Sequence, residues 1–294
     1  MRNRIFAVAF SVAILALAAA PLARAADTQN VPANPTLQQA VNGAWRTPAY
    51  VKRDKYRHPV KVLEFFGLKP DMTVVELEPA GGWWTEFLAP YLKAKGHLIE
   101  TVPPASSKGS NRTRTHFLAK LKASPALYSK ITTAPFAPPK TVTLGPPDSA
   151  DMVLTFRNIH DWVNEHNGAA KAVFVAAFKV LKPGGVFGVV SHRALPYANP
   201  VTSAHDLHRL PEDFVIQLGL NAGFRLAAVS EVNKNPKDSL MVNVHHLPPD
   251  LDMGDTAAQK KKYEKVGESD RMTFRFVKPK TSRRMSGSVG GAAN

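Results

Sequence analysis

The chain of 294 residues contains no cysteine. This absence excludes disulfide bonds, and it excludes any metal site or nucleophile that needs a thiolate. Internal repeats are also lacking, and the longest apolar stretch, residues 5–20, ends at Pro21, short of the roughly 20 residues that a membrane-spanning helix needs. A folded form must therefore be stabilised by a hydrophobic core, for which the chain is long enough.

The amino-terminal segment has the pattern of a secretory signal peptide. Arg2 and Arg4 precede the apolar stretch, and Ala23-Arg24-Ala25 has the small-x-small form of a cleavage site. We therefore expect residues 1–25 to be removed by cleavage after Ala25. The protein is then expected in the periplasm or outside the cell, with no transmembrane segment left.

Positive charge is in excess. The formal net charge is +15, and removal of the three arginines within residues 1–25 leaves +12. Much of this charge lies in a basic run, Lys260, Lys261, Lys262 and Lys265, and near a tail, residues 279–294, that we expect to be disordered. The run is either a solvated surface or a site of weak attraction to anionic surfaces. Only one aromatic residue, Tyr263, lies within it, so specific nucleic-acid binding is not expected.

Between these ends, strand-like and helix-like segments alternate as in an α/β protein. Strands are expected at 73–77, 98–102, 152–156, 186–190, 224–229 and 272–277, and helices at 60–66, 85–92, 116–121, 173–181 and from Pro211. Residues 26–57 are polar and interrupted by proline, and we expect a loosely structured arm with Trp45 and Tyr50 as its anchors. The βαβ spacing predicts parallel pairing, with ligands bound at the carboxyl ends of the strands.

The most informative stretch is VVELEPAGGWWTEFLAPYL, residues 74–92. An apolar strand ends in an acid, and two glycines lead into a helix. Gly81 and Gly82 would let the backbone approach a ligand closely, and Thr85 would cap a helix whose N-terminus attracts anions. A glycine pair at such a turn can also serve only to pack the helix on the sheet. The stretch therefore indicates a binding corner only in combination with features downstream.

Several further motifs occur in a fixed order along the chain. They are RDKYRHPVKVLEFFGLKPDM, which leads into the stretch above, DMVLTFRNIHDW, LKPGG, LHRLPEDFV with LNAGF, and DRMTFRFVKP. In these motifs, over roughly residues 50–278, the chain resembles a family of exported, predicted class I S-adenosylmethionine-dependent methyltransferases. The resemblance implies a Rossmann-like, seven-stranded, mostly parallel α/β sheet with an antiparallel last strand and helices on both faces. This domain would occupy residues 58–278, with an insertion at about 232–270.

The resemblance also implies which residues bind the cofactor, S-adenosylmethionine. The loop Glu78, Pro79, Ala80, Gly81, Gly82 and Trp83 would wrap its methionine part, and Glu76 would face its ammonium group or order the loop. Glu78 and Ala80 stand where this fold commonly has glycine. Val102 replaces the acid that usually binds the ribose, and Glu100, two residues earlier on the same strand face, is the candidate substitute.

The loop after the strand at 152–156 carries the candidate catalytic residues Asn158, His160 and Asp161. An imidazole with a pKa near neutrality suits a general base, so His160 is the candidate base and Asp161 its orienting partner. The alternative is a structural histidine bonded to a nearby carbonyl. Trp162, His208 and Arg209 are expected to line the substrate pocket.

Three functions from different classes stay open. The first is methyl transfer to a small-molecule or cell-envelope acceptor. The second is a catalytically inactive protein of this fold that binds or scaffolds in the periplasm, which the missing ribose acid would suit. A nicotinamide-dependent oxidoreductase is disfavoured because no G-x-G-x-x-G follows the first strand. No metal site is expected, since His205 and His208 have no clear third ligand beside them.

Overall fold

The computed structural model describes residues 31–106 and 111–280. The signal peptide expected at residues 1–25 lies outside these ranges, and so do all but the first two residues of the tail expected at 279–294. Among the described residues, no helix combines the length and the apolar character needed to cross a bilayer.

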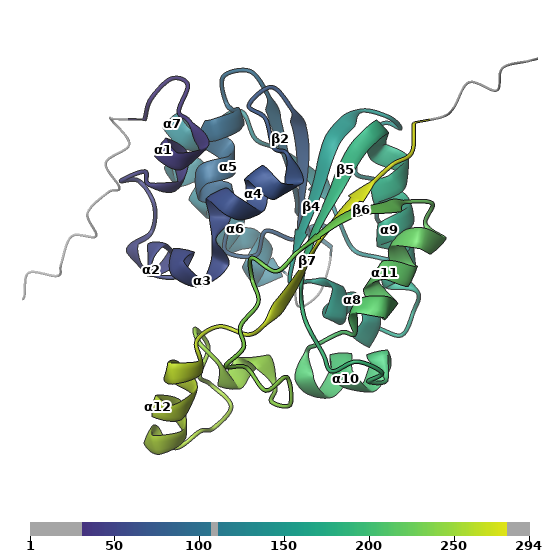
Figure 1. Ribbon diagram of the computed structural model, residues 1–294. Helices are drawn as coiled ribbons and strands as arrows, with labels where there is room; N and C mark the ends of the chain where they lie inside the picture. Colours follow the sequence, from purple (N-terminus) through teal and green to yellow (C-terminus); the bar gives the residue numbers. More distant parts are fainter. Residues whose placement is uncertain (1–30, 107–110, 281–294) are drawn as a thin grey trace, which may run out of the picture.

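A seven-stranded sheet in the order β3-β2-β1-β4-β5-β7-β6 forms the centre of the protein (Figure 1). The strands are β1 (Thr73–Leu77), β2 (His97–Val102), β3 (Thr132–Pro135), β4 (Ala150–Phe156), β5 (Leu181–His192), β6 (Arg225–Ser230) and β7 (Arg271–Val277). Only β7 runs antiparallel to its neighbours, β5 and β6. The mostly parallel, Rossmann-like sheet with an antiparallel last strand is thereby confirmed.

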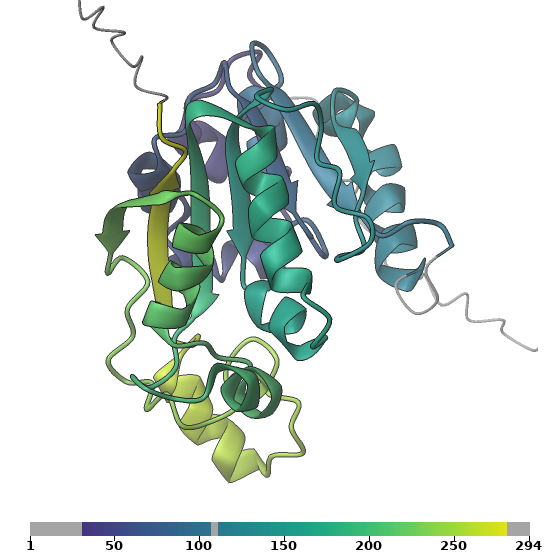
Figure 2. The same ribbon diagram turned by 90° about the vertical axis from the view of Figure 1, so that its right-hand side faces the viewer.

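Helices cover both faces of the sheet, as expected (Figure 2). One face carries α1 (Leu37–Val41), α4 (Pro59–Phe66), α5 (Thr85–Leu92) and α7 (Pro125–Tyr128), and the other carries α8 (Ile159–Asn164), α9 (Ala169–Val180) and α11 (Glu212–Asn221). Successive strand residues serve opposite faces: Val74 and Met152 belong to the first core, and Val75 and Val153 to the second. The remaining helices are α2 (Pro48–Val51), α3 (Asp54–Arg57), α6 (Asn111–Ala123), α10 (Pro200–Leu207) and α12 (Ala257–Val266).

The segment from residue 31 to residue 57 differs from the loosely structured arm that the sequence predicts. Trp45 is buried, and its indole N–H donates to the carbonyl of Glu86 at 2.8 Å. The Glu86 carboxylate in turn accepts hydrogen bonds from the backbone N–H and the hydroxyl of Thr47. These buried bonds fix the segment against α5, so that α2 and α3 can contribute side chains to a site.

The segment between β6 and β7, residues 231–270, lies beyond the carboxyl ends of the parallel strands. This placement follows from topology, because β6 ends and β7 begins at that edge (Figure 1). The segment contains a short 3₁₀ helix, η2 (Val244–His246), and α12. It covers the range for which the sequence predicts an insertion, about 232–270, and it brings further side chains to the edge where ligands bind in this architecture.

Candidate functional site

Two adjoining cavities open at the carboxyl ends of β1, β2 and β4. The first, about 350 Å³, we call the arginine cavity, because Arg53, Arg57 and Arg157 are part of its wall. The second, about 260 Å³, we call the β2 cavity, because its wall includes Thr101 and Val102. Both cavities are lined by Glu78, Pro79, Ala80, Asn158 and Asp161. Five of the residues singled out in the sequence therefore meet at one junction.

The loop after β1 has left-handed backbone at two residues that are not glycine. Glu78 has φ +47° and Ala80 has φ +50°. Such residues cost about 1–3 kcal/mol each and are concentrated at functional sites. The two positions where the sequence lacks the usual glycine thus adopt the backbone conformation that glycine would favour.

The two glycines of the loop have a different role from the one expected. A Cβ at Gly81 would lie 2.3 Å from the hydroxyl oxygen of Tyr50, which donates a hydrogen bond to the Gly81 carbonyl. Gly81 and Trp83 line the arginine cavity, whereas Gly82 lies outside both cavities. Gly81 therefore admits a side chain of the protein itself, and the expected contact of Gly82 with a cofactor is not supported.

Glu78 separates the two cavities. Its carboxylate accepts a hydrogen bond from the indole N–H of Trp162 at 2.8 Å, and its backbone N–H donates to the hydroxyl of Thr101 at 2.8 Å. Burial raises the pKa of Glu78 to about 7 against the effect of the Trp162 hydrogen bond, and the charges of Asp161 and Glu165 add to the increase. Near neutral pH this carboxyl is therefore only partly charged. Trp162 lines the β2 cavity and not the arginine cavity, which corrects its expected place in the substrate pocket.

Glu76 and Glu100 lie side by side on β1 and β2. Burial raises the pKa of Glu76 to about 7, although its contacts with Glu100 and Thr85 lower it. Burial, together with the charge of Glu76, raises the pKa of Glu100 well above its usual range. Glu76 lines the arginine cavity, but Glu100 is fully buried and lines neither cavity. The expectation that Glu100 binds the ribose is therefore wrong. Thr85 bonds to Glu76 at 3.3 Å and does not cap α5.

Arginines from the amino-terminal segment form a wall that the sequence analysis missed. Arg53 and Arg57 both bond to Glu268, at 2.6 and 3.3 Å. Within the described structure, the Nη2 atom of each arginine is buried and has no hydrogen-bond acceptor. The arginine cavity therefore has two buried donors suited to an anionic group. Arg53 and Arg57 are four residues apart, a spacing that places side chains on one helical face, and this was the signal available in the sequence.

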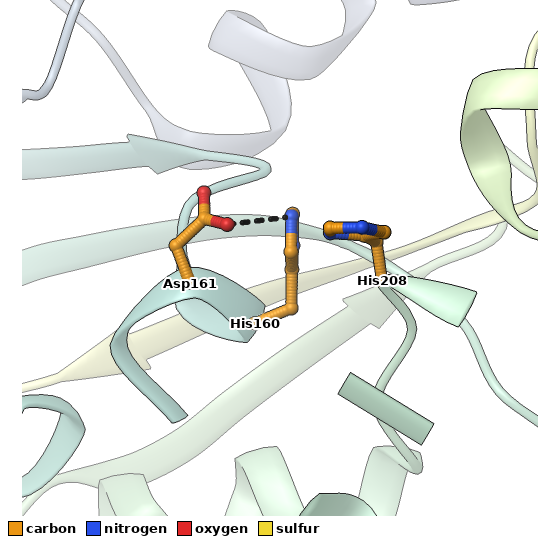
Figure 3. A group of neighbouring side chains, drawn as sticks. All are labelled: His160, Asp161 and His208. Atoms are coloured by element: carbon orange, nitrogen blue, oxygen red, sulfur yellow. Dashed lines mark ion pairs between the residues drawn. The ribbon is translucent and has the colours of Figure 1, made fainter. Parts of the chain in front are cut away.

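The candidate catalytic residues lie at the start of α8. The Asn158 amide donates to the Leu77 carbonyl at 2.8 Å and to the Thr155 hydroxyl at 3.3 Å, and so ties this turn to the end of β1. His160 Nε2 lies 3.4 Å from Asp161 Oδ1, as the dashed line in Figure 3 marks. Asn158, His160 and Asp161 all line the arginine cavity.

The electrostatics of His160 differ from the sequence expectation. Burial, assisted by the nearby charges of His208 and Arg157, lowers its pKa to about 3, so the ring is neutral and a weak base at neutral pH. Burial also raises the pKa of Asp161 to about 6, against the effect of His245. The lowered pKa therefore does not support the general-base role that the sequence analysis gave to His160.

The two residues expected from the segment after β5 lie outside both cavities. Arg209 is fully buried and forms two hydrogen bonds with the Asp238 carboxylate, at 2.8 and 3.1 Å. It therefore joins the 231–270 segment to the domain, and its place in the substrate pocket is corrected. His208 lies beside His160, with ring centroids 5.1 Å apart. His245 and Asp250, which the sequence analysis does not identify, also line the arginine cavity.

No family model and no curated protein matches the sequence. The structure is similar to that of a SAM-dependent methyltransferase from Aquifex aeolicus, with a TM-score of 0.51, 14% identity, and coverage of 83% of this chain and 100% of that chain. It is also similar to phosphoethanolamine N-methyltransferase 2 of Haemonchus contortus in complex with phosphomonomethylethanolamine and S-adenosylhomocysteine, with a TM-score of 0.52, 15% identity, and coverage of 83% and 57%.

A third similar structure is the [4+2]-cyclase SpnF, with a TM-score of 0.51, 15% identity, and coverage of 76% of this chain and 81% of that chain. At such identities the similarity shows a shared fold, that of the class I methyltransferases. Because the same fold also occurs in a cyclase, the reaction must be argued from the site itself.

Proposed function

We propose that the protein binds S-adenosylmethionine across the two adjoining cavities and transfers its methyl group to a small-molecule or cell-envelope acceptor. One observation carries this proposal. Two cavities meet at the carboxyl ends of β1, β2 and β4, at residues 78–80, and the larger one contains two buried guanidinium donors without acceptors. Together the cavities fall within the range of about 300–1,000 Å³ typical of ligand sites.

The residues of the arginine cavity fit the methionine part of this cofactor. The free Nη2 atoms of Arg53 and Arg57 would bind its carboxylate, and Glu76 would bind its ammonium group. The β2 cavity would hold the nucleoside, between Phe117 and Trp162. Because Val102 offers the ribose no acceptor, affinity would depend on the other groups.

The bound cofactor supplies a methyl group that its sulfonium already makes electrophilic, so no covalent enzyme intermediate is needed. The protein's task is then to align an acceptor and exclude water. Asn158, His160 and Asp161 are our candidates for contacting the acceptor, since they line the arginine cavity beside the loop after β1. His160, as a neutral ring, would orient the acceptor by a hydrogen bond.

A second candidate is a catalytically inactive protein that keeps the fold for binding in the periplasm. The observation in its favour is that Val102 replaces the ribose acid and that Glu100 lies too deep to substitute for it. Saturable binding of S-adenosylmethionine would not by itself decide between the two functions. Methyl transfer to an acceptor fraction from the cell envelope would decide in favour of the enzyme.

The binding test uses calorimetric titration of residues 26–294 with S-adenosylmethionine and S-adenosylhomocysteine. We expect binding at micromolar concentrations. Ala80→Phe, which places a bulky ring at the junction of the cavities, should abolish it. Ala80→Gly is the matched control: it suits the left-handed backbone and should bind at least as well as wild type. Absence of binding to wild type, or equal binding by Ala80→Phe, would overturn the proposal.

Export is part of the same proposal, and it is supported by the pattern of residues 1–25. Sequencing of the amino terminus of the protein recovered from the periplasm or the medium should begin at Ala26. A chain that retains Met1 and stays in the cytoplasm would contradict export. S-adenosylmethionine is made in the cytoplasm, so an enzyme that stays there would have direct access to its cofactor, whereas an exported one needs a supply outside the inner membrane.

A further inference from the structure

Three potential metal ligands from two separate segments meet at the edge of the arginine cavity. They are His160 and Asp161 on α8, and His208 at the carboxyl end of α10. Each offers one ligand atom, and the three atoms lie within 4.8 Å of one another. Figure 3 shows Asp161 facing the ring of His160 on one side, with His208 on the other.

The packing of α8 against α10 fixes this arrangement. The side-chain amide of Asn164 on α8 donates to the carbonyl of Ala204 on α10 at 3.1 Å. His208 then ends α10 with left-handed backbone, φ +56°. This reversal of the chain places His208 beside His160.

The hydrogen bonds of the described residues leave the two histidines with unused nitrogens. His160 is only 5% exposed, yet its Nδ1 atom has no partner, and neither has the buried Nδ1 atom of His208. A buried polar atom without a partner costs free energy and is uncommon in native proteins. The His208 nitrogen therefore lacks a partner that the described residues do not provide, whereas the His160 nitrogen that faces Asp161 is Nε2.

We propose that His160, Asp161 and His208 bind a divalent transition-metal cation of the Zn²⁺ class. Imidazole nitrogens combined with one carboxylate suit such cations, whereas Mg²⁺ and Ca²⁺ prefer oxygen ligands throughout. Zn–N and Zn–O bonds are about 2.0–2.2 Å long, so two ligand atoms of one ion lie at most about 4.4 Å apart. The 3.4 Å between His160 Nε2 and Asp161 Oδ1 already fits an ion bound at Nε2, and a small rotation of His208 completes the set.

Neighbouring groups agree with a site that has an open coordination position. His245 packs against His208 with ring centroids 4.7 Å apart, and its Nδ1 is bonded to the Asp250 carboxylate at 2.9 Å, as in histidines that bind metals through the other nitrogen. His245 or a water molecule would take the fourth position, on the side of the arginine cavity. The positive charge of Arg157 opposes the cation, and the carboxylates of Asp161 and Asp250 offset it.

The sequence analysis considered a different pair, His205 and His208, and found no third ligand. In the structure His205 points away: its side chain is 74% exposed and pairs with Asp206. The two partners of His208 come from a helix more than forty residues earlier, which spacing along the chain could not reveal.

The test is a calorimetric titration of tag-free, chelator-treated protein, residues 26–294, with Zn²⁺ and separately with Mg²⁺, in the absence of any nucleoside. We expect one Zn²⁺ per chain and no saturable binding of Mg²⁺. Affinity for Zn²⁺ should fall at least about tenfold in His208→Asn and in Asp161→Asn. Asparagine tolerates the left-handed backbone of residue 208, so the first variant should stay folded.

His205→Ala is the matched control, since it removes a histidine from the same helix and should leave Zn²⁺ affinity unchanged. Zn²⁺ should also raise the melting temperature of wild type and of His205→Ala but not that of His208→Asn. Absence of stoichiometric Zn²⁺ binding, or equal affinity in His208→Asn and wild type, would overturn the proposal. Neither result would bear on cofactor binding, which is measured without metal.

Discussion

The charge of Glu78 affects both cavities, because this residue lines each of them. It lies at their junction, is held by Trp162 and Thr101, and has left-handed backbone. A fully charged carboxylate there would repel the carboxylate of a bound S-adenosylmethionine. Its raised pKa reduces that repulsion near neutral pH, so the departure from glycine is compatible with binding.

The raised pKa of Glu78 predicts a pH-dependent stability. Its ordinary pKa of 4.5 rises to about 7 on folding, so the folded protein holds this proton more tightly. The resulting stabilisation is present below pH 4.5 and is lost as the pH rises through 7. Glu78→Gln keeps an acceptor for Trp162 and cannot ionise. We therefore expect its free energy of unfolding, measured in urea, to rise relative to that of wild type between pH 5 and pH 8. The same difference in unfolding free energy at every pH in this range would contradict the assigned pKa of Glu78.

The sequence identified several of these side chains but not how deeply they lie. Asn158, His160 and Asp161 were predictable because they follow a strand at its carboxyl end, where this fold presents ligand-binding groups. Strand periodicity gave the correct face for Glu100 but could not show that it is buried beneath the cavity floor. Arg209 was misplaced because its partner, Asp238, lies 29 residues away in sequence.

The regular elements of the sheet were largely predictable. β1 and α5 have the predicted bounds, because alternation in the strand and the apolar spacing in the helix are both clear. β3 was missed because its residues, Thr132–Pro135, are mostly exposed and carry no such pattern. The helices α1, α2 and α3 have only four or five residues each, and helices so short form only through tertiary contacts, which the sequence does not display.

One such tertiary contact is an ion-pair network that joins α3 to β7. Glu268, just before β7, bonds to Arg53 and Arg57 near α3 and to Arg271 on β7. Burial alone would raise the pKa of Glu268, but the three arginines lower it well below its usual range. This network holds two arginines of the cavity wall in place.

Removal of the Glu268 charge should therefore destabilise the fold. We expect Glu268→Gln to lose about 3 kcal/mol of unfolding free energy at pH 7, because it leaves buried guanidinium groups uncompensated. A depressed pKa contributes stability above the unfolded value, which is lost as the pH falls, so the difference from wild type should shrink below about pH 4. Glu264→Gln, which changes an exposed acid on α12, is the control and should unfold like wild type in urea.

Charge is distributed unevenly over the molecule. The basic run Lys260, Lys261, Lys262 and Lys265 lies on α12, which has no buried residue. This helix belongs to the 231–270 segment beyond the carboxyl ends of the strands (Figure 1). We propose that it attracts the protein weakly to anionic surfaces of the cell envelope.

Sedimentation with lipid vesicles tests this attraction. Residues 26–294 should bind vesicles rich in phosphatidylglycerol at low salt and not vesicles of phosphatidylcholine. At about 1 kcal/mol per lysine near such a surface, changing the four lysines of the run to glutamine should weaken binding at least tenfold. Changing four exposed lysines elsewhere, Lys52, Lys69, Lys95 and Lys140, makes the same change in net charge and should have a smaller effect. Equal loss in both variants would mean that only net charge matters.

The candidate site is assembled from three distant parts of the chain. The segment at 50–57 provides the arginines, the strand ends provide the junction, and the 231–270 segment provides His245 and Asp250. Only the strand ends were readable from the sequence, since the other two parts reach the site through tertiary contacts. Binding of a nucleoside cofactor in this composite site is the central claim.

A crystal structure of residues 26–294 grown with saturating S-adenosylhomocysteine tests that claim most directly. The account predicts one ligand per chain, with its carboxylate at Arg53 and Arg57 and its adenine in the β2 cavity beside Phe117. Empty cavities, or a ligand bound elsewhere on the protein, would contradict it.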